Sequence, residues 1–565
     1  MLKSRKKHSH IHEVAPDEIF LDSQNLPNFN TQQFEGRLEK PIPKRVVFWV
    51  GAFFSIVTVM FLFRLGILQI AEGQAYLQKS QNNTLTQVPV FADRGMILDR
   101  NGIKLAWNVW SADNPDRLQV PVRAYIAESG FAHILGYVSY PQKDSSGNYW
   151  QSSFLGKDGV EKQYNSSLNG TNGVRITQTD VKGNVQAENV VTPPVNGNNI
   201  TLSIDSRIQN QLYSSIADMA KTDSFQGGGG VIMNIHTGEV LALTSYPEYD
   251  PNILSTGKDT KTIKGYLSNT QKVFLNRVIS GNYAPGSIVK PFLGYGALVD
   301  NIITPFKQIW ANGSISVPNP YDPTKKTIFN DHGSFGFVDM EKAIALSSDV
   351  YFYEIGGGYQ SQPGLGITGI DNYANLFHIG QKTGIDLSGE ISGVVPSPTW
   401  KAKTFPTDST WRLGDTYNTA IGQYGFQVTP IQMVRAVAGL ATGNLVTPHV
   451  ILNDPTLSAQ SIPLNLNSAD VSVVEVGMRQ VVLMGTGQAL NVSSVQVAAK
   501  SGTAQVGLGN TNTNSWIVGF FPYNNPQYAF AVLMERGPKA DSGNATRVMA
   551  NTINYMAINT PDYLK

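Results

Sequence analysis

A serine and a lysine three positions apart stand out as a possible nucleophile and base. Ser287 and Lys290 follow Pro285-Gly286, a dipeptide typical of a turn, so the serine is expected at or just before the start of a helix. On a helix, side chains at positions i and i+3 share a face. A lysine amine kept neutral by burial or by a second cation could take the proton of the serine hydroxyl and activate it.

Two further polar motifs follow. Ser347-Ser348-Asp349 precedes an aromatic run, and taken alone it is typical of the start of a surface helix with an acidic cap. Lys500-Ser501-Gly502-Thr503 interrupts an apolar strand pattern, where a lysine is unusual. Gly502 would permit close approach of a ligand backbone, and the flanking hydroxyls of Ser501 and Thr503 could hold a carboxylate or a peptide. A bulge at a sheet edge is the alternative interpretation of this segment.

The elements that must position these motifs indicate an α+β fold. Residues 229–247 are expected to form a hairpin around His236-Thr237-Gly238. A helix capped by Asp205 precedes this hairpin, and a second helix is expected at residues 544–558. Three late strands are expected at residues 497–504, 515–521 and 528–535. Two early strands and three late ones predict an antiparallel sheet packed with helices, an α/β sandwich.

The region before the sandwich is predicted to consist of strands and loops. Residues 86–108 are expected to form a hairpin with a type I′ turn at Asn101-Gly102. Residues 141–200 are rich in Gly, Asn and Ser, which favours an extended, loop-rich module.

A membrane anchor is expected near the N-terminus. Residues 46–63 are uncharged and mostly apolar, and continued to residue 70 they can cross about 30 Å of hydrocarbon as a helix. A buried core helix and a cleaved signal peptide fit this segment less well. Arg37, Lys40, Lys44 and Arg45 lie just before or at its start, and the positive-inside rule keeps that end in the cytoplasm. We therefore expect a single-pass protein of the cytoplasmic (inner) membrane, with residues 1–45 as a cytoplasmic tail, residues 46–70 as the anchor and the rest outside.

Composition excludes several classes of protein. The sequence has no cysteine, which excludes thiol nucleophiles, disulfide frameworks and zinc fingers. With 43 Lys+Arg against 42 Asp+Glu, the formal net charge is +1, so no nucleic-acid partner is expected. No metal is expected either: Asp331-His332 is interpreted as a loop pair rather than as part of a metal site.

Taken together and in this order, the S-x-x-K, S-x-D and K-S-G motifs resemble those of the active-serine penicillin-recognising enzymes. From about residue 86 to the C-terminus the chain is similar to the class B penicillin-binding proteins, and in particular to their elongation, rod-shape branch. The segments that carry this resemblance are Arg94–Gly102, His133–Val138, Gly156–Glu161, residues 383–401, Trp411–Thr416 and Ile421–Gln423, together with the aspartate at position 349.

The resemblance implies a peptidoglycan D,D-transpeptidase that cross-links stem peptides during cell-wall elongation and is covalently inhibited by β-lactams, without a metal or cofactor. Residues 71–200 would form a mostly β pedestal domain, and residues 201–565 the transpeptidase domain. The segment between Asn108 and His133 is short, so the head subdomain of the pedestal is expected to be reduced. A SEDS-family glycan polymerase and other elongation-machinery proteins are the implied partners.

The resemblance also implies a role for each site residue. Ser287 would attack the penultimate D-alanine carbonyl and Lys290 would be its base, while Ser347 would relay a proton to the leaving D-alanine. Asp349 would orient the lysine or the substrate amide. The remaining members of the implied site are Lys500, which would supply positive potential, Ser501 and Thr503, which would bind the substrate carboxylate, and Gly502 between them. Asp349 also places a carboxylate beside two lysines, which is expected to alter the pH profile.

The sequence alone leaves other functions open. A non-catalytic sensor or scaffold that binds peptidoglycan or β-lactams is the alternative from another class. A class A β-lactamase is disfavoured because no E-x-x-L-N segment lies between Asp349 and Lys500. A bifunctional synthase would need a glycosyltransferase domain before the pedestal, for which the chain has too little length, and D,D-carboxypeptidase activity is a further possibility.

Overall fold

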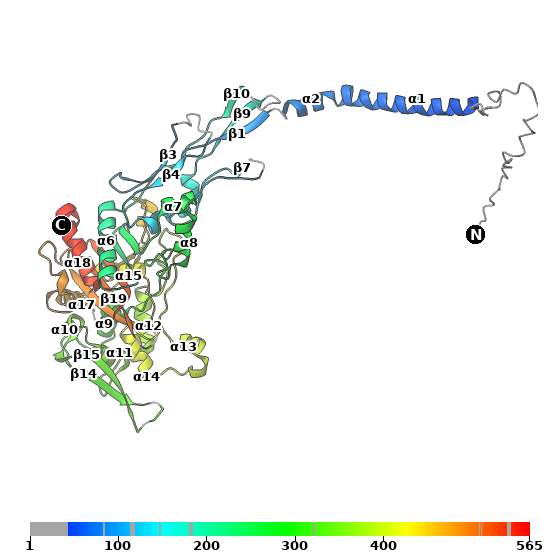
Figure 1. The fold of residues 1–565 in the computed structure, drawn as a ribbon. Helices are drawn as coiled ribbons and strands as arrows, with labels where there is room; N and C mark the ends of the chain where they lie inside the picture. Colours follow the sequence, from blue (N-terminus) through cyan, green and yellow to red (C-terminus); the bar gives the residue numbers. More distant parts are fainter. Residues whose placement is uncertain are drawn as a thin grey trace, which may run out of the picture. The chain divides into compact units, whose positions relative to one another are not determined.

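The computed structural model describes most of the chain after residue 42 (Figure 1). The described residues are 43–82, 85–112, 119–145, 149–179, 185–319, 321–322, 324–507, 509, 511–538 and 544–565. They fall into two compact units, one made of residues up to 86 with 179–183, the other of residues 87–178 and 184–565. Most of the predicted cytoplasmic tail lies outside the described residues.

The first unit contains the predicted apolar helix. Helix α1 (Lys44–Gly66) continues into a π-helical turn, η4 (Ile67–Ala71), and α2 (Gly73–Asn82) follows. The most apolar part of the stretch Lys44–Ala71 has a mean hydropathy of 2.5 and is not buried by other parts of the protein. Within the described part of the chain it is the one helix long and apolar enough to span a membrane, as the sequence predicted.

The described residues from 85 to 201 form short strands and helices. Strands β1 (Leu85–Val90), β9 (Gly173–Thr179) and β10 (Val185–Thr192) form one sheet, and β11 (Ile200–Thr201), β2 (Ile97–Leu98), β3 (Lys104–Val109) and β4 (Val122–Tyr125) form another. The smaller elements are β5 (Val138–Ser139) paired with β8 (Leu155–Gly156), β6 (Gln142–Lys143) paired with β7 (Tyr149–Gln151), and helices α3 (Ala132–Leu135), α4 (Gly159–Gln163) and α5 (Asn165–Leu168). Val109 pairs with Val122, so only residues 110–121 lie between β3 and β4.

The turn between β2 and β3 differs from the predicted type I′ turn. A type I′ turn needs positive φ at both central residues, but of the pair Asn101-Gly102 only Gly102 has one, at 83°. The Asp99 side chain accepts hydrogen bonds from the backbone N–H groups of Asn101 and Ile103, both at 2.8 Å. This aspartate-bonded turn, with a left-handed glycine at its end, replaces the predicted two-residue loop.

A buried ion triad joins the segments of the second unit that precede the large sheet. The Glu161 carboxylate receives the Arg94 Nε at 2.6 Å and the Arg123 Nε at 2.8 Å, and all three side chains are fully buried. Burial alone would raise the pKa of Glu161, but the charges of Arg123 and Arg94 hold it below its usual value. The triad explains why three distant polar residues are tolerated in this interior.

The core of the second unit is the predicted five-stranded antiparallel sheet. Its strands, β12 (Gly227–Asn234), β13 (Val240–Tyr246), β18 (Ala498–Val506), β19 (Asn512–Phe521) and β20 (Tyr528–Pro538), lie in the order β13-β12-β20-β19-β18. Successive side chains of β12 point to opposite faces of the sheet, so Val231 and Met233 belong to one buried cluster and Ile232 to the other. Early and late strands therefore meet in one sheet, as the sequence predicted.

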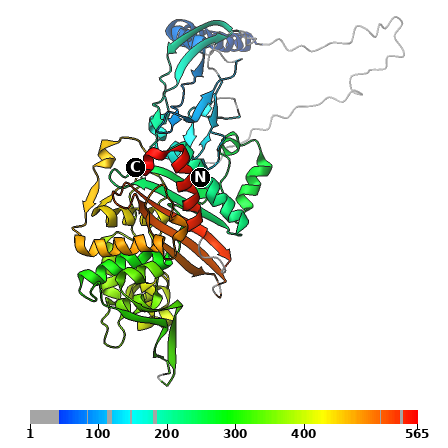
Figure 2. The ribbon, with the colours of Figure 1, turned by 90° about the vertical axis from the view of Figure 1, so that its left-hand side faces the viewer.

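Helices cover both faces of this sheet (Figure 2). On one face lie α6 (Ser206–Thr222) and α18 (Asn544–Asn559), both of which the sequence predicted. Asp205 caps α6 through the Arg207 N–H, and Ile208, Leu212 and Ile216 of its apolar face are buried. The other buried cluster includes side chains of α9 (Lys290–Val299), α10 (Met340–Leu346), α11 (Asp349–Gly357), α12 (Gly366–Leu376), α14 (Leu413–Ala420), α15 (Pro430–Thr442) and α17 (Ser468–Leu483).

The remaining elements lie at the edges of these layers. The longest of them is a two-stranded ribbon of β14 (Ile309–Pro318) and β15 (Lys326–Val338). The others are α7 (Pro251–Thr256), α8 (Thr260–Ser268), α13 (Pro398–Thr404), α16 (Pro455–Ser458), β16 (Asn444–Val446), β17 (Ser461–Pro463) and the 3₁₀ turns η5 (Gly286–Val289), η6 (Pro406–Asp408), η7 (Gln488–Leu490) and η9 (Pro561–Leu564). The architecture confirms the predicted α+β class, whereas the division at residues 45, 70 and 200 stays a prediction.

The ion triad yields a stability prediction. Glu161→Gln leaves Arg94 and Arg123 buried without a counter-charge, so we expect it to lower the free energy of unfolding by roughly 3–5 kcal/mol. Glu188→Gln is the matched control, because Glu188 pairs with Arg175 but is 41% exposed, and its loss should be below about 1 kcal/mol. Denaturant unfolding of the purified proteins measures both, and equal losses would contradict the prediction.

Candidate active site

The predicted nucleophile lies where the sequence placed it, in a turn that leads into a helix. Ser287 is in the 3₁₀ turn η5, directly before α9, and its side chain is half-buried at the wall of a cleft. Gly286 before it has a φ of 57°, and a β-carbon there would lie 2.8 Å from the Thr503 carbonyl oxygen. The Gly286 N–H donates to the Gly422 oxygen at 3.0 Å. The glycine thus lets this turn pack tightly against β18.

Lys290 is completely buried at the start of α9. Its Nζ donates to the Ser347 carbonyl oxygen at 2.7 Å and to the Asp349 Oδ1 at 2.6 Å, and lies 3.4 Å from the Ser347 Oγ. Within the described part of the chain the hydrogen bonds of Nζ go to Ser347 and Asp349 rather than to Ser287. The structure therefore joins the first two motifs through the lysine.

Lys500 approaches the same serine from the sheet. It is fully buried in β18, and its Nζ donates to the Ser347 Oγ at 2.9 Å and to the Ser501 carbonyl oxygen at 2.8 Å. Burial lowers the pKa of Lys500 well below its usual value, the positive charge of Lys290 lowers it further, and Asp349 opposes both effects. The Ser347 hydroxyl, at the left-handed end of α10, thus lies between two lysine amines.

Ser501, Gly502 and Thr503 belong to β18, the edge strand of the sheet. Their register with β19 is continuous, so the alternative of a bulge is wrong for this segment. At Gly502 a β-carbon would lie 2.8 Å from the Ile288 Cγ2 and 2.9 Å from the Pro285 oxygen. The glycine is therefore required by the close approach of the turn that carries Ser287, a reason that the sequence did not suggest.

One cleft of about 690 Å³ brings the motifs together. Its wall includes Ser287, Ser347, Asp349, Ser501, Gly502 and Thr503, and also side chains that sequence reasoning missed, among them Asn330, His332, Asn418, Tyr424 and Thr486. The Thr486 and Ser501 hydroxyls are hydrogen-bonded to each other. The sequence analysis considered His332 only as part of a loop pair, and Tyr424 directly follows the Ile421–Gln423 segment. No pattern in the sequence marked these positions as part of a site, because they come from several separate elements.

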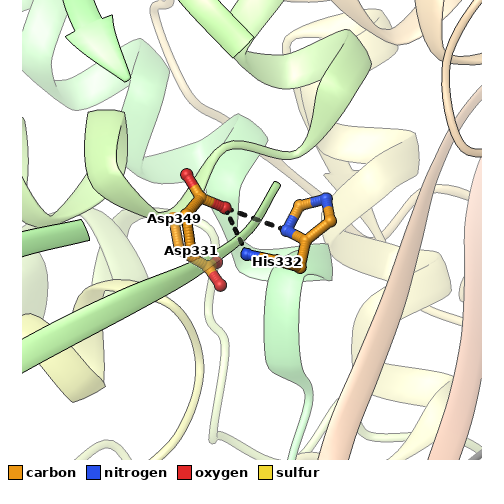
Figure 3. Close-up of side chains that lie close together, drawn as sticks. All are labelled: Asp331, His332 and Asp349. Atoms are coloured by element: carbon orange, nitrogen blue, oxygen red, sulfur yellow. Dashed lines mark hydrogen bonds and ion pairs between the residues drawn. The ribbon is translucent and has the colours of Figure 1, made fainter. Parts of the chain in front are cut away.

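Asp331 and His332 lie in strand β15, so their interpretation as a loop pair is wrong (Figure 3). The Asp331 carboxylate accepts the Ser348 hydroxyl at 2.8 Å, the Val350 N–H at 2.9 Å and the His332 Nδ1 at 2.9 Å. Burial alone would raise the pKa of Asp331, but these hydrogen bonds hold it well below its usual value. Asp331 therefore fixes the start of α11 and with it the S-x-D turn.

Asp331, His332 and Asp349 also lie close enough to be considered as metal ligands, with one atom from each within 4.8 Å of the others (Figure 3). Their oxygens already have partners, since Asp331 bonds to Ser348 and Val350, and Asp349 pairs with Lys290. The group acts as part of a hydrogen-bond network, and we assign no metal to it.

The family comparisons agree with this geometry. The model of the penicillin binding protein transpeptidase domain matches residues 228–554, and that of the penicillin-binding protein dimerisation domain matches residues 117–202. A relative named peptidoglycan D,D-transpeptidase MrdA, from Salmonella typhimurium, is 28% identical, over 89% of this chain and 94% of its own length.

Solved structures show the same likeness. PBP2 of Pseudomonas aeruginosa, in complex with WCK 5153, is 32% identical with a TM-score of 0.69, and the match covers 85% of this chain and 98% of that one. PBP2 of Helicobacter pylori, in complex with MreC, is 26% identical with a TM-score of 0.68, over 84% and 98% of the two chains. The chain therefore belongs to the penicillin-binding protein transpeptidase family and, within it, to the class B, rod-shape branch.

Proposed function

We propose that this protein is a serine D,D-transpeptidase that cross-links peptidoglycan stem peptides during cell elongation. The observation that carries the proposal is the position of the Ser347 Oγ, 2.9 Å from the Lys500 Nζ and 3.4 Å from the Lys290 Nζ, in the cleft that Ser287 lines. A hydroxyl between two buried amines can pass a proton in either direction, which an acyl-transfer reaction requires.

Acylation begins at Ser287. Its Oγ attacks the carbonyl carbon of the penultimate D-alanine while its proton passes to the Lys290 amine, whose own proton has moved through the Ser347 hydroxyl to Lys500. The tetrahedral intermediate then collapses, the C–N bond to the terminal D-alanine breaks, and the Ser347 hydroxyl relays a proton from the lysines to the leaving amine. The products are an ester on Ser287 and free D-alanine.

The edge strand supplies the binding groups. Because β18 is the last strand of its sheet, an extended stem peptide can add alongside it. Ser501 and Thr503 hold the terminal carboxylate, with the positive charge shared by the two lysines behind them. The backbone N–H groups of Ser287 and Thr503 stabilise the oxyanion.

In the second half-reaction the amine of a neighbouring stem peptide attacks the ester, forms the cross-link and returns the proton to Ser287.

The apolar helix provides the membrane anchor of this enzyme. The basic residues before it favour a cytoplasmic N-terminus and a catalytic domain on the periplasmic or cell-wall side. A SEDS-family polymerase would deliver new glycan strands to the cleft. The PBP2 of Helicobacter pylori forms a complex with MreC, which supports further contacts of this protein with the elongation machinery.

Covalent labelling tests the nucleophile. The parent protein should form a stable adduct with fluorescent penicillin, and Ser287→Ala should abolish it because no other hydroxyl replaces the attacking oxygen. Ser280→Ala is the matched control, since Ser280 lies outside the cleft and bonds to the Gly389 oxygen. A folded parent without an adduct would refute the proposal, and rapid hydrolysis of the drug would point to a lactamase.

Asp349→Asn tests the electrostatic control of Lys500. The carboxylate lies 2.6 Å from the Lys290 Nζ, and its charge raises the pKa of the neighbouring Lys500 against the effects of burial and of Lys290, whereas an amide of the same shape does not. We expect the pH at which acylation reaches half its maximal rate to move to a lower value in the variant. Stopped-flow acylation measured across pH checks this, and an unchanged or raised midpoint would contradict it.

The buried Lys500 should make stability depend on pH. Its folded-state pKa lies below that of the unfolded chain, so between the two values the unfolded state binds a proton that the folded state lacks. Stability then rises with pH up to the unfolded lysine value of about 10.4, by at most about 1.4 kcal/mol per pH unit. Lys500→Met should flatten this rise in unfolding experiments, whereas Lys264→Met, at an exposed position, should not. Equal slopes in parent and Lys500→Met would count against the prediction.

A further inference from the structure

The ribbon of β14 and β15 presents one face to the domain and the other to solvent (Figure 1). On the inner face Ala311 and Ile315 are buried, and the Phe329 ring packs against Tyr353 and Tyr417 at 5.7 and 5.0 Å. Besides Ser316 opposite the exposed Ile328, the outer face carries three opposed pairs, Trp310 with Phe337, Asn312 with Ser334 and Ser314 with Asn330. We call these six residues the ribbon face.

The ribbon face is continuous with the cleft. Asn330 lines the cleft that also contains Ser287, and Ser314 lies opposite it on β14. From Ser314 to Trp310 the strand advances four residues, or roughly 13 Å. The face therefore runs from the catalytic cleft to the aromatic pair Trp310–Phe337 at the base of the ribbon.

The chemistry of the face suits a sugar polymer. Trp310 and Phe337 are 54% and 57% exposed, and their ring centroids lie 4.7 Å apart. Exposed aromatic pairs mark binding surfaces, and the C–H faces of pyranose rings stack on such rings. The other four residues of the ribbon face carry amide and hydroxyl groups, with the Ser334 Oγ donating to Asn312 at 2.8 Å, and the exposed His332 lies beside them on β15. These groups match sugar hydroxyl and N-acetyl groups, and Lys342, whose Nζ donates to the Phe337 carbonyl oxygen at 3.2 Å, lies next to the face but outside it.

We propose that the ribbon face binds the glycan backbone of peptidoglycan, the N-acetylated sugar chain to which a stem peptide in the cleft is attached. The inference rests on the proposed function, because a cross-linking cleft brings a glycan strand to its own rim. Binding of the strand beside the cleft would restrict where a stem peptide can lie and would favour polymeric over short substrates.

Peptide-free glycan strands test the proposal with the full-length protein in detergent. Each protein is first labelled with fluorescent penicillin, so that every molecule observed has a folded and occupied cleft, and the anisotropy of the adduct is followed as strands are added. The parent should bind. The double variant with Trp310→Ala and Phe337→Ala should bind with an apparent affinity at least about tenfold weaker. The single variant Trp310→Phe, which keeps a ring at this position, should retain most of the affinity of the parent.

Phe306→Ala is the matched control, because Phe306 is an aromatic residue 85% exposed in the turn before β14 and outside the ribbon face. It should change the affinity by less than about twofold. A labelled parent that does not bind glycan, or a double variant that binds as tightly as the parent, overturns the ribbon proposal. Failure of the parent to take up penicillin overturns the proposed function instead, so the two outcomes are distinct.

Discussion

The arrangement of this protein depends on holding two buried lysine amines around one serine hydroxyl. Lys290 and Lys500 lie within 3.4 and 2.9 Å of the Ser347 Oγ. Like charges repel strongly in an interior of low dielectric constant, so two protonated lysines could not both remain there without compensation. Asp349 supplies one negative charge, and the lowered pKa of Lys500 removes one positive charge.

This constraint explains why the site uses several layers of the fold. Lys290 begins a helix, Lys500 belongs to the edge strand and Ser347 ends a second helix, so their positions hold only while sheet and helices stay in contact. Gly286 and Gly502 bring the layers together where a side chain would keep them apart. On the far side Asp331 ties the ribbon to the turn that carries Ser347.

The sequence predicted the parts whose signal is local. The turn before Lys290, the Asp205 cap and the strands around Lys500 follow from neighbouring residues, and each lies where it was expected. The turn at Asn101-Gly102 was wrong because the Asp99 side chain, outside the dipeptide, determines its form. The role of Asp331 could not be predicted, since its partners become neighbours only when β15 packs against α11.

The glycine at 502 has a consequence for how this protein can change under antibiotic pressure. Any side chain there would collide with the backbone oxygen of Pro285 and with Ile288, next to the nucleophile, so a substitution at this point of the cleft wall also displaces the turn that carries Ser287. Variation that alters drug affinity while sparing this contact must come from other lining positions, such as Tyr424 and Asn418. Compounds that contact the Gly502 backbone therefore bind a part of the wall that a single substitution cannot change independently of the nucleophile.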